Sequence, residues 1–416
     1  VQEIYELSAE TIAQSFVIDG TQAGDVELVL EVETELVEQR AQPGLQFGNE
    51  LGQVEYGAAF LVRGADRLAI ETRFDAERLV LHVPASLRGE LPIVIDPVLG
   101  TRLNTGRTGQ GNDTQPDVAY DASSATFILV WTTMFSQTDA DPWMEVLDAE
   151  GYSLNGSARA FDLSTLFHTA PRIANVNAAD RFLVVMERRQ AATAAVVGYL
   201  ISAASYIPGP AFTISQGGTA SHASPDVGGD PRAAATGAFC VTWVTSVGTG
   251  SEIWACIVGT DGTVRTPTQI SPRGGYALAD ISQSNDCLGL APRWCLVYAD
   301  VRSATRADLC GAMIGVDGAV LVPHRVVHAT GGALLFPSVS SPAQAADGSP
   351  QWFITLEQQS PAQAFGLVVP SDLGSVWLEP LTAYHGIGPI RVRAETDGVR
   401  FALVSGSTAT GTLVMT

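Results

Sequence analysis

Cysteine is the residue type in this chain whose chemistry depends most on which residues lie beside it. There are five, Cys240, Cys256, Cys287, Cys295 and Cys310. Cys240 and Cys295 each lie in an apolar stretch, and Cys256 and Cys310 lie in the stretches that follow. If each pair of stretches forms an antiparallel hairpin, opposed Cα atoms approach to about 4.5 Å, at the short end of the range for a disulfide. We therefore predict Cys240–Cys256 and Cys295–Cys310 disulfides, as in an oxidising compartment, with Cys287 as the odd thiol. The alternatives are buried free thiols and a Cys287–Cys295 bridge.

Three acidic residues are the candidates for hydrolytic chemistry. Glu187, Asp300 and Glu357 each follow an apolar stretch at similar places in the chain. Glycoside hydrolases place two carboxylates on either side of the bond they cleave, but acids at the ends of strands are usually only solvated. The sequence holds no Gly-x-Ser-x-Gly, His-Glu-x-x-His or Walker motif. We therefore assign no catalytic residue and expect a non-enzymatic protein rather than an enzyme.

Two short motifs resemble metal sites. His324 and His328 have the spacing of a helical zinc pair, but HRVVH is typical of a strand, in which residues four apart are separated by about 13 Å and cannot hold one ion. Asp139 and Asp141 in TDADPW are the nearest fragment to a calcium loop. We therefore predict no cofactor and no metal, with calcium as the alternative.

A sequence repeat defines the elements that must position these residues. A bulky residue, three mostly apolar residues and a fifth residue recur at intervals of 55, 57, 55, 58 and 49 residues. The six copies are Phe127–Trp131, Phe182–Met186, Phe239–Trp243, Trp294–Tyr298, Trp352–Leu356 and Phe401–Ser405.

Each copy of the repeat predicts four short antiparallel strands. An extended segment that usually begins with proline precedes the apolar stretch, and a third strand, a turn such as Asp-Gly and a fourth strand follow. Such a unit repeated six times predicts a six-bladed β-propeller, with stacked solenoids as the alternative. The blades are expected near 115–164, 169–217, 223–273, 277–329, 335–384 and 386–416. Because the sixth copy stops after its third strand, we predict that 98–104 closes the ring.

Residues 1–96 predict a separate, small antiparallel β domain of the sandwich kind, so the propeller is assigned to 97–416. Apolar residues from Val26 to Leu36 alternate with glutamates, which is typical of a strand with one buried face. The glutamates indicate a solvated outer face.

The composition excludes some partners. The formal net charge is −21, and all 23 basic residues are arginine, so no basic patch for nucleic acid is visible. No apolar run approaches the ~20 residues of a membrane span. We expect neither a nucleic-acid partner nor membrane insertion.

The segments LQFGNELGQVEYGAAFLV and PIVIDPV, followed by PDVAYD and PDVGGD, resemble large secreted bacterial surface proteins. In those proteins a β-rich domain precedes propeller repeats of the FG-GAP or integrin-like kind. The resemblance implies an extracellular or cell-surface location and partners that are other extracellular proteins or glycans. DLGSVW, which begins at Asp372, resembles the tail of the Asp-box turn of sialidase-type propellers, although Pro370 replaces the expected serine.

These observations predict a non-enzymatic structural or adhesive module. One alternative is a carbohydrate-binding lectin, which should carry equivalent aromatic and polar residues on successive blades. Another is a propeller glycoside hydrolase. The last is a subunit of an extracellular polymer, which would self-associate.

Overall fold

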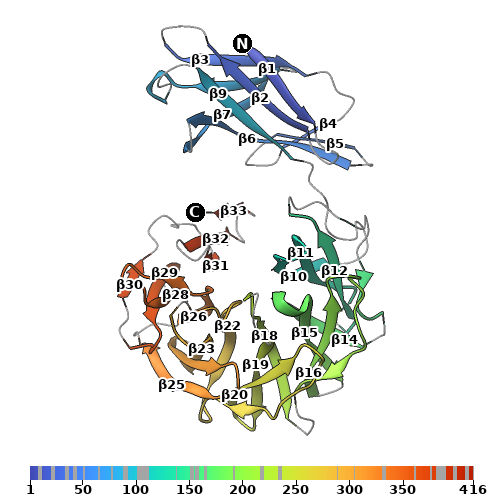
Figure 1. The fold of residues 1–416 in the computed structure, drawn as a ribbon, viewed down its shortest axis with the longest axis vertical. Coiled ribbons are helices and arrows are strands. Elements are labelled where there is room, and N and C mark those ends of the chain that lie inside the picture. Colours follow the sequence, from blue (N-terminus) through green and yellow to red (C-terminus); the bar gives the residue numbers. More distant parts are fainter. Residues whose placement is uncertain are drawn as a thin grey trace. The chain divides into compact units, whose positions relative to one another are not determined.

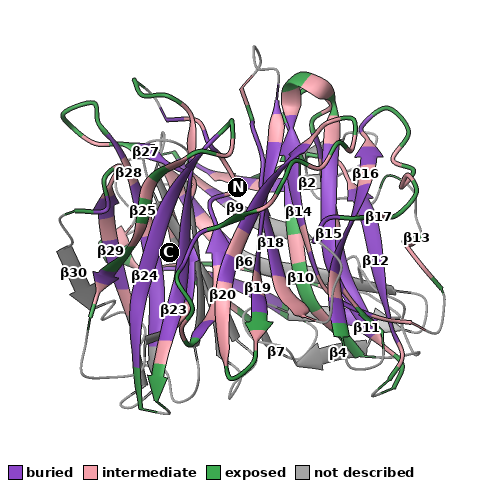
Figure 2. Ribbon diagram, turned by 90° about the horizontal axis from the view of Figure 1, so that it is seen from below, coloured by how far each residue is buried: buried purple, intermediate pink, exposed green. Residues whose placement is uncertain are grey.

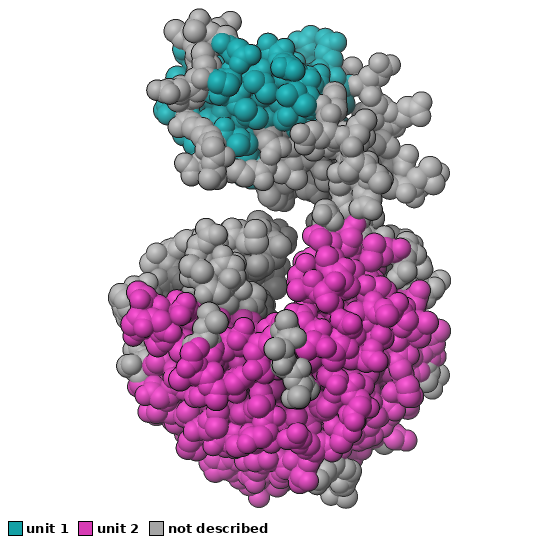
Figure 3. Space-filling view, viewed as in Figure 1, with its two compact units in different colours: residues 1–104 teal, residues 105–416 magenta. Residues whose placement is uncertain are grey.

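The computed structural model describes the chain except for a set of segments, of which 101–111 and 381–389 are the longest. The side chains of 334, 358–359, 362–364 and 375–416, and of parts of the first hundred residues, are also not described. The chain divides into two compact units, Val1–Asn104 and Thr105–Thr416 (Figure 3). The boundary therefore lies at 104/105 instead of the expected 96/97. Among the described residues, no helix is long and apolar enough to cross a membrane.

The first unit is an antiparallel β domain. Its strands are β1 (Gln2–Leu7), β2 (Ile12–Ile18), β3 (Val26–Glu31), β4 (Val37–Arg40), β5 (Leu45–Asn49), β6 (Gly52–Arg63), β7 (Asp66–Asp75), β8 (Arg78–Val83) and β9 (Ile93–Gly100). They pair in the order β1-β2-β9-β6-β7-β8-β3, with β5 also beside β6 and β4 beside β5. The core includes Phe16, Leu61, Leu81 and Ile95. On β3 the glutamates are exposed as predicted, because the alternating apolar residues pack against this core.

The predicted closing strand is wrong for residues 98–100. These residues belong to β9, where Leu99 pairs with Tyr56 and Gly100 with Glu55 on β6. The strand that begins at Ile93 continues without a break, so its backbone is already hydrogen-bonded within the first unit. Residues 101–104 lie outside the described residues.

The second unit is a six-bladed β-propeller, and its sheets follow one another around a common centre in chain order (Figure 1). Blade 1 consists of β10 (Asn112–Asp121), β11 (Thr126–Met134), β12 (Ala140–Leu147) and β13 (Arg159–Ala160), and blade 2 of β14 (Phe167–Val176), β15 (Arg181–Gln190), β16 (Thr193–Ser202) and β17 (Phe212–Thr213). Blade 3 consists of β18 (Ser221–Gly228), β19 (Ala238–Val247), β20 (Gly250–Gly259) and β21 (Thr268–Gln269), and blade 4 of β22 (Tyr276–Ile281), β23 (Arg293–Ser303), β24 (Arg306–Gly315) and β25 (Val320–His328). Blade 5 consists of β26 (Leu334–Val339), β27 (Ala343–Gln344), β28 (Pro350–Gln359), β29 (Ala362–Pro370) and β30 (Trp377–Pro380), and blade 6 of β31 (Ile390–Thr396), β32 (Phe401–Ser407) and β33 (Thr412–Met415).

The apolar stretches of the repeat form the second strand of each blade, and in blades 2 to 4 these stretches are buried on both faces (Figure 2). In blade 2, Val184 and Met186 pack toward blade 1, whereas Leu183 and Val185 pack toward blade 3. Four hydrophobic clusters lie in this way between consecutive blades 1 to 5. A strand buried on both faces must be apolar at consecutive positions, which explains why the repeat was visible in the sequence.

The proline-initiated segments form the first strands, and those of blades 1 to 5 contain the same irregularity. Just before the proline position the register shifts, and one residue adopts a positive φ of 51–56°: Gln115, Ala170, Ser224, Leu278 and Phe336. The aspartate that follows in three blades accepts a hydrogen bond from the next blade. Asp117 Oδ2 accepts it from the Ile173 N–H at 2.9 Å, Asp226 Oδ2 from the Ile281 N–H at 2.8 Å, and Asp280 Oδ2 from the Val339 N–H at 2.8 Å. The Pro-Asp pattern therefore joins blades.

Candidate functional site

The structure corrects the predicted disulfides, because all five cysteines are buried free thiols. In blade 3, Cys240 lies opposite Ile257 while Cys256 lies opposite Val241. The offset of one residue turns the two side chains to opposite faces of the sheet. Cys240 packs between blades 3 and 4, and Cys256 between blades 2 and 3.

In blade 4, the register separates the second predicted pair further. Cys295 lies opposite Met313, and Cys310 lies opposite Tyr298. Their side chains also enter different inter-blade clusters. Cys287 shares a cluster with Cys295, but the two are not bonded. Burial raises the pKa of every one of these thiols, to about 11 for Cys287 and about 12 for Cys256 and Cys310.

The three candidate acids do not converge. The Glu187 carboxylate faces blade 3, where it pairs with Arg189 and accepts the Ser224 N–H at 3.3 Å. Glu357 follows Leu356, which packs toward blade 4, so its side chain leaves the opposite face of blade 5. Asp300 follows its apolar stretch one residue later than the other two and therefore faces the preceding blade. Each acid belongs to a different inter-blade space, which does not provide the paired carboxylates of a glycosidase.

Asp300 belongs to an ionic cluster at the blade 3–4 interface. It lies directly opposite Asp308, and both are almost fully buried, with 1% and 4% of their surfaces exposed. The Arg302 guanidinium pairs with Asp300 and lies 3.6 Å from an Asp308 oxygen. Two like charges directly opposed on a sheet repel each other, so this arginine neutralises the repulsion.

The two candidate zinc ligands have separate surroundings. His324 Nδ1 lies 2.6 Å from the Tyr298 hydroxyl, and its ring stacks on that tyrosine with centroids 5.8 Å apart. Burial lowers the pKa of His324 and of His328. At His328 the negative charge of Asp308 partly opposes this lowering of the pKa. Both residues lie in β25 as predicted, four positions apart on a strand.

The candidate calcium fragment carries one perturbed carboxyl. Asp141 is 5% exposed, and burial together with repulsion from Asp139 and Asp162 raises its pKa to about 6. Within the described part of the chain, no three His, Cys, Asp or Glu side chains are placed to hold a metal ion.

A set of equivalent positions on blades 1 to 5 escaped the sequence analysis. On the first strand of each of these blades, the residue two positions before the positive-φ residue pairs with a residue of the second strand. We call these the end pairs: Asp113–Thr133, His168–Arg188, His222–Thr245, Tyr276–Asp300 and Leu334–Gln358. The signal that locates them is a constant offset of three residues before the proline position. It was missed because the residue types differ from blade to blade.

Side chains of the end pairs in blades 1 to 3 are hydrogen-bonded within their own blades or buried. Thr133 accepts a hydrogen bond from Trp131 Nε1 and donates one to Asp113, at 3.2 and 2.6 Å. Thr245 accepts one from Trp243 Nε1 at 3.0 Å. His168 is 1% exposed. The hydrogen bonds of these residues therefore stabilise the ends of the strands, and few of their polar groups are accessible to a ligand.

The open site lies at the opposite ends of the strands, between blades 3 and 4. A hollow of about 540 Å³ is lined by residues that include Arg232, Ile257, Asp261, Thr263, Arg265 and Asp317. We call it the inner hollow. Two Asp-Gly turns border it, and both are held by their own aspartates, since Asp261 Oδ1 accepts the Thr263 N–H and Asp317 Oδ1 accepts the Ala319 N–H, each at 2.9 Å. The hydrogen bonds from Thr263 lower the pKa of Asp261, which is therefore ionised at neutral pH.

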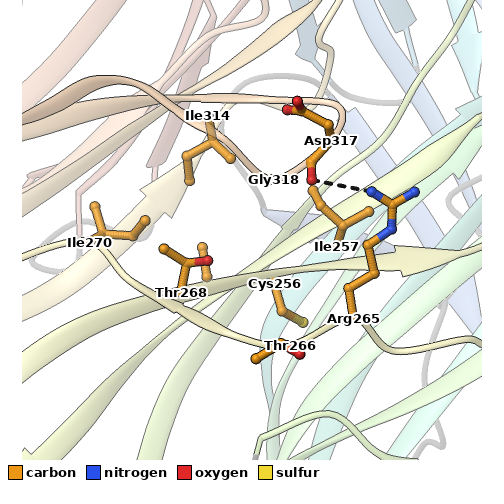
Figure 4. Close-up of a pocket in the computed structure, with 10 residues that line it drawn as sticks. Cys256, Ile257, Arg265, Thr266, Thr268, Ile270, Ile314, Asp317 and Gly318 are labelled. Carbon is orange, nitrogen blue, oxygen red and sulfur yellow. Dashed lines mark hydrogen bonds between the residues drawn. The ribbon is translucent and has the colours of Figure 1, made fainter.

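Arg265 connects the two blades that border the inner hollow. Its Nη1 donates to the Asp317 carbonyl at 3.2 Å and so links blade 3 to a turn of blade 4 (Figure 4). Arg325 makes the same link one blade later, donating to the Asp372 carbonyl at 2.9 Å. Asp372, in the motif that resembles an Asp-box, accepts the Gly374 N–H at 2.8 Å and so holds a surface turn.

Arg265 also borders two further spaces. One is a narrow crevice of about 60 Å³ lined by Cys256, Thr266, Thr268 and Ile314 (Figure 4). The other is a hollow of about 390 Å³, lined by Thr213, Ile214 and Ser215 of blade 2 and by residues 264–267 of blade 3. We call the first space the crevice and the second the outer hollow.

The chain matches no protein-family model and no curated protein. Solved structures similar to it include a subtype N10 neuraminidase-like protein of A/little yellow-shouldered bat/Guatemala, which has 8% sequence identity and a TM-score of 0.44, with 74% of this chain and 95% of that chain covered. A fucose-specific lectin from Aleuria aurantia has 9% identity and a TM-score of 0.41, with 72% and 90% covered. An α-L-arabinofuranosidase from Lactobacillus brevis has 11% identity and a TM-score of 0.37, with 64% and 90% covered.

Proposed function

We propose that this protein is a non-enzymatic adhesive module whose propeller binds a glycan in the inner hollow between blades 3 and 4. The observation that carries the proposal is the lining of that hollow, in which arginines alternate with aspartates at fixed positions. A guanidinium only donates hydrogen bonds and a carboxylate only accepts them, whereas a sugar hydroxyl does both. Such a lining therefore suits a ligand rich in hydroxyl groups.

The size and rigidity of the hollow support the proposal. Its volume of about 540 Å³ falls within the roughly 300–1,000 Å³ typical of ligand sites. Arg232 is fixed by Asp230, whose Oδ1 accepts the Arg232 Nε–H at 2.8 Å, and Arg265 is fixed by the Asp317 carbonyl. Groups held in place before binding lose little conformational entropy when the ligand arrives.

The same lining favours binding over hydrolysis. Glycoside hydrolysis needs one carboxylic acid that is protonated at working pH. The Asp261 pKa is lowered by the turn that holds it, and Asp230 is committed to Arg232. The third carboxyl of the lining, Asp317, accepts the Ala319 N–H at 2.9 Å. None of the three carboxyls is arranged to donate a proton to a glycosidic oxygen.

A glycan array tests the proposal with a matched pair of variants. Arg265→Ala removes a guanidinium from the hollow, and Arg325→Ala removes the equivalent inter-blade link where it does not line the hollow. We expect the native protein and Arg325→Ala to retain the same glycans, and Arg265→Ala to lose at least about tenfold in affinity, as the loss of a charge-assisted hydrogen bond implies. An empty array, or equal behaviour of the two variants, would contradict the proposal.

We also propose that the protein acts outside the cell or at its surface. The support for this location is the resemblance to secreted repeat proteins. The cysteines do not add support, because buried free thiols do not require an oxidising compartment. Labelling of intact producing cells with a membrane-impermeant reagent, followed by mass spectrometry, should recover peptides of this chain. Recovery only after lysis would refute this location.

A further inference from the structure

The inner hollow, the crevice and the outer hollow form a series along one segment of blade 3. The inner hollow and the crevice share Ile257, Arg265 and Asp317, and the crevice and the outer hollow share Arg265 and Thr266. Arg265 lines all three spaces, and residues 263–267 supply part of the lining of each. Hydrogen bonds from the Arg265 N–H to the Ile257 carbonyl at 2.9 Å, and a bridge between Val258 and Val264, hold this segment in place.

The volumes of the three spaces suit a ligand with wide units and narrow connections. The two hollows, of about 540 and 390 Å³, are each of ligand-site size. The crevice of about 60 Å³ lies far below that range and is suited only to a thin linkage. A compact ligand would occupy one hollow, whereas an extended chain would use all three spaces.

The charges of the lining select among extended chains. Three aspartates, Asp230, Asp261 and Asp317, face two arginines in the inner hollow, so its lining carries one net negative charge. The outer hollow is lined by Thr213, Thr266 and Arg265 beside the apolar Ile214 and Val264. Its Ser215 is buried, and the hydroxyl accepts the Val196 N–H at 3.0 Å. The whole chain has a formal net charge of −21. An acidic polymer would therefore be repelled in the inner hollow and, by the net charge of the chain, at a distance.

We infer that the ligand is a neutral, linear oligosaccharide that lies across Arg265, with one part in the inner hollow and another in the outer hollow. The inference rests on the proposed glycan-binding function and specifies its ligand class. Arg265 donates to the ligand from the middle of the path, and the Thr213 side of blade 2 contacts only chains that are long enough to pass the crevice. Binding of the second part is then intramolecular, which raises the affinity for long chains without any new site.

Chain length and charge are the variables that test this inference. The full-length protein is titrated by calorimetry with neutral cello- and malto-oligosaccharides of one to six units, and with oligogalacturonides of the same lengths. We expect affinity for the preferred neutral series to rise at least tenfold from the monosaccharide to the hexasaccharide. The acidic series should bind at least tenfold more weakly than the neutral one at each length.

A blocking variant locates the second part of the path. Thr213 is exposed and lines only the outer hollow, so Thr213→Trp should reduce binding of the hexasaccharide to the level of short chains and leave short chains unchanged. Gln269 holds the equivalent position on the outer strand of blade 3 and lines none of the three spaces. Gln269→Trp is therefore the matched control and should bind like the native protein.

The outcomes separate the inference from the function on which it rests. If no glycan binds in the titrations or on the array, the proposed function fails and the inference fails with it. If short and long chains bind equally and Thr213→Trp has no effect, glycan binding stands but the extended path is overturned. Tighter binding of the oligogalacturonides would overturn the preference for neutral chains.

Discussion

Asp280 shows how one side chain couples two blades. Its carboxylate leaves the first strand of blade 4 and accepts the Val339 N–H of blade 5 at 2.8 Å. The aspartate is 5% exposed and Val339 is 3% exposed, so the N–H group has little access to water. A buried N–H without an acceptor costs about 1–3 kcal/mol. The aspartate that follows the proline position of the repeat therefore has a structural role, also where alanine replaces the proline, as at Ala279.

We predict that Asp280→Ala lowers the free energy of unfolding of the propeller by about 1.5–3 kcal/mol, the usual contribution of a hydrogen bond to a charged group. Asp280→Asn should lower it less, because the amide keeps an oxygen acceptor at the same place. Urea unfolding followed by tryptophan fluorescence measures both values. Equal losses in the two variants would show that the hydrogen bond to Val339 is not the cause.

The cysteines give a second prediction at this scale. Burial raises their pKa values and limits access of reagents, so iodoacetamide at pH 8 should label none of the five in the folded protein. The same protein unfolded in guanidinium without reductant should take up five labels, as counted by intact mass. Fewer than five labels after unfolding would contradict the prediction of five free thiols and indicate a disulfide.

The first strands carry the main lesson at the scale of the element. In blades 1 to 5 each has a residue of positive φ before the proline position, although none of these residues is glycine. An L-residue in this conformation is strained by roughly 1–2 kcal/mol relative to glycine. The recurrence of the same strain in five blades indicates that the bulge sets the direction of the strand end, and with it the position of the end pairs.

Ala170→Gly tests this strain. Glycine normally weakens a strand by roughly 0.5–1 kcal/mol relative to alanine, but at φ 51° it should instead stabilise the propeller by up to about 1 kcal/mol. The control is Ala195→Gly, also half-buried but at an ordinary strand position of the same blade, where the usual loss is expected. Thermal unfolding of the two variants gives the comparison, and a loss at both positions would mean that the bulge is not strained.

At the scale of the whole molecule, the two units have separate cores. Phe16, Leu61 and Ile95 belong to the cluster of residues 1–104, and the four inter-blade clusters belong to residues 105–416. A unit with its own core is able to fold alone.

We therefore predict that residues 105–416, produced without the first unit, retain a β-type circular-dichroism spectrum and unfold in one cooperative transition. Calorimetry of the full chain should show this transition at the same temperature, together with a second one that belongs to residues 1–104. A shift of more than a few degrees in the transition of residues 105–416 would show that the two units stabilise each other.

The sequence by itself determined the repeat, the number of blades and the β character of both units. These features are local: a strand buried on both faces has to be apolar at successive positions, and a tight turn requires residues such as Asp-Gly, so each leaves a mark on consecutive residues. The same reasoning placed His324 and His328 on a strand. It misjudged the cysteines, because a shift of one residue in register moves a side chain to the other face of a sheet, and turn lengths do not specify the register that closely.

Only the tertiary structure decided where the candidate site lies. Arg265 and Asp317 are far apart in the chain and belong to different blades, and they meet because consecutive blades pack face to face. Glu187, Asp300 and Glu357 look equivalent in the sequence but enter separate inter-blade spaces. A hollow between two blades is a property of their packing, and no stretch of consecutive residues encodes it.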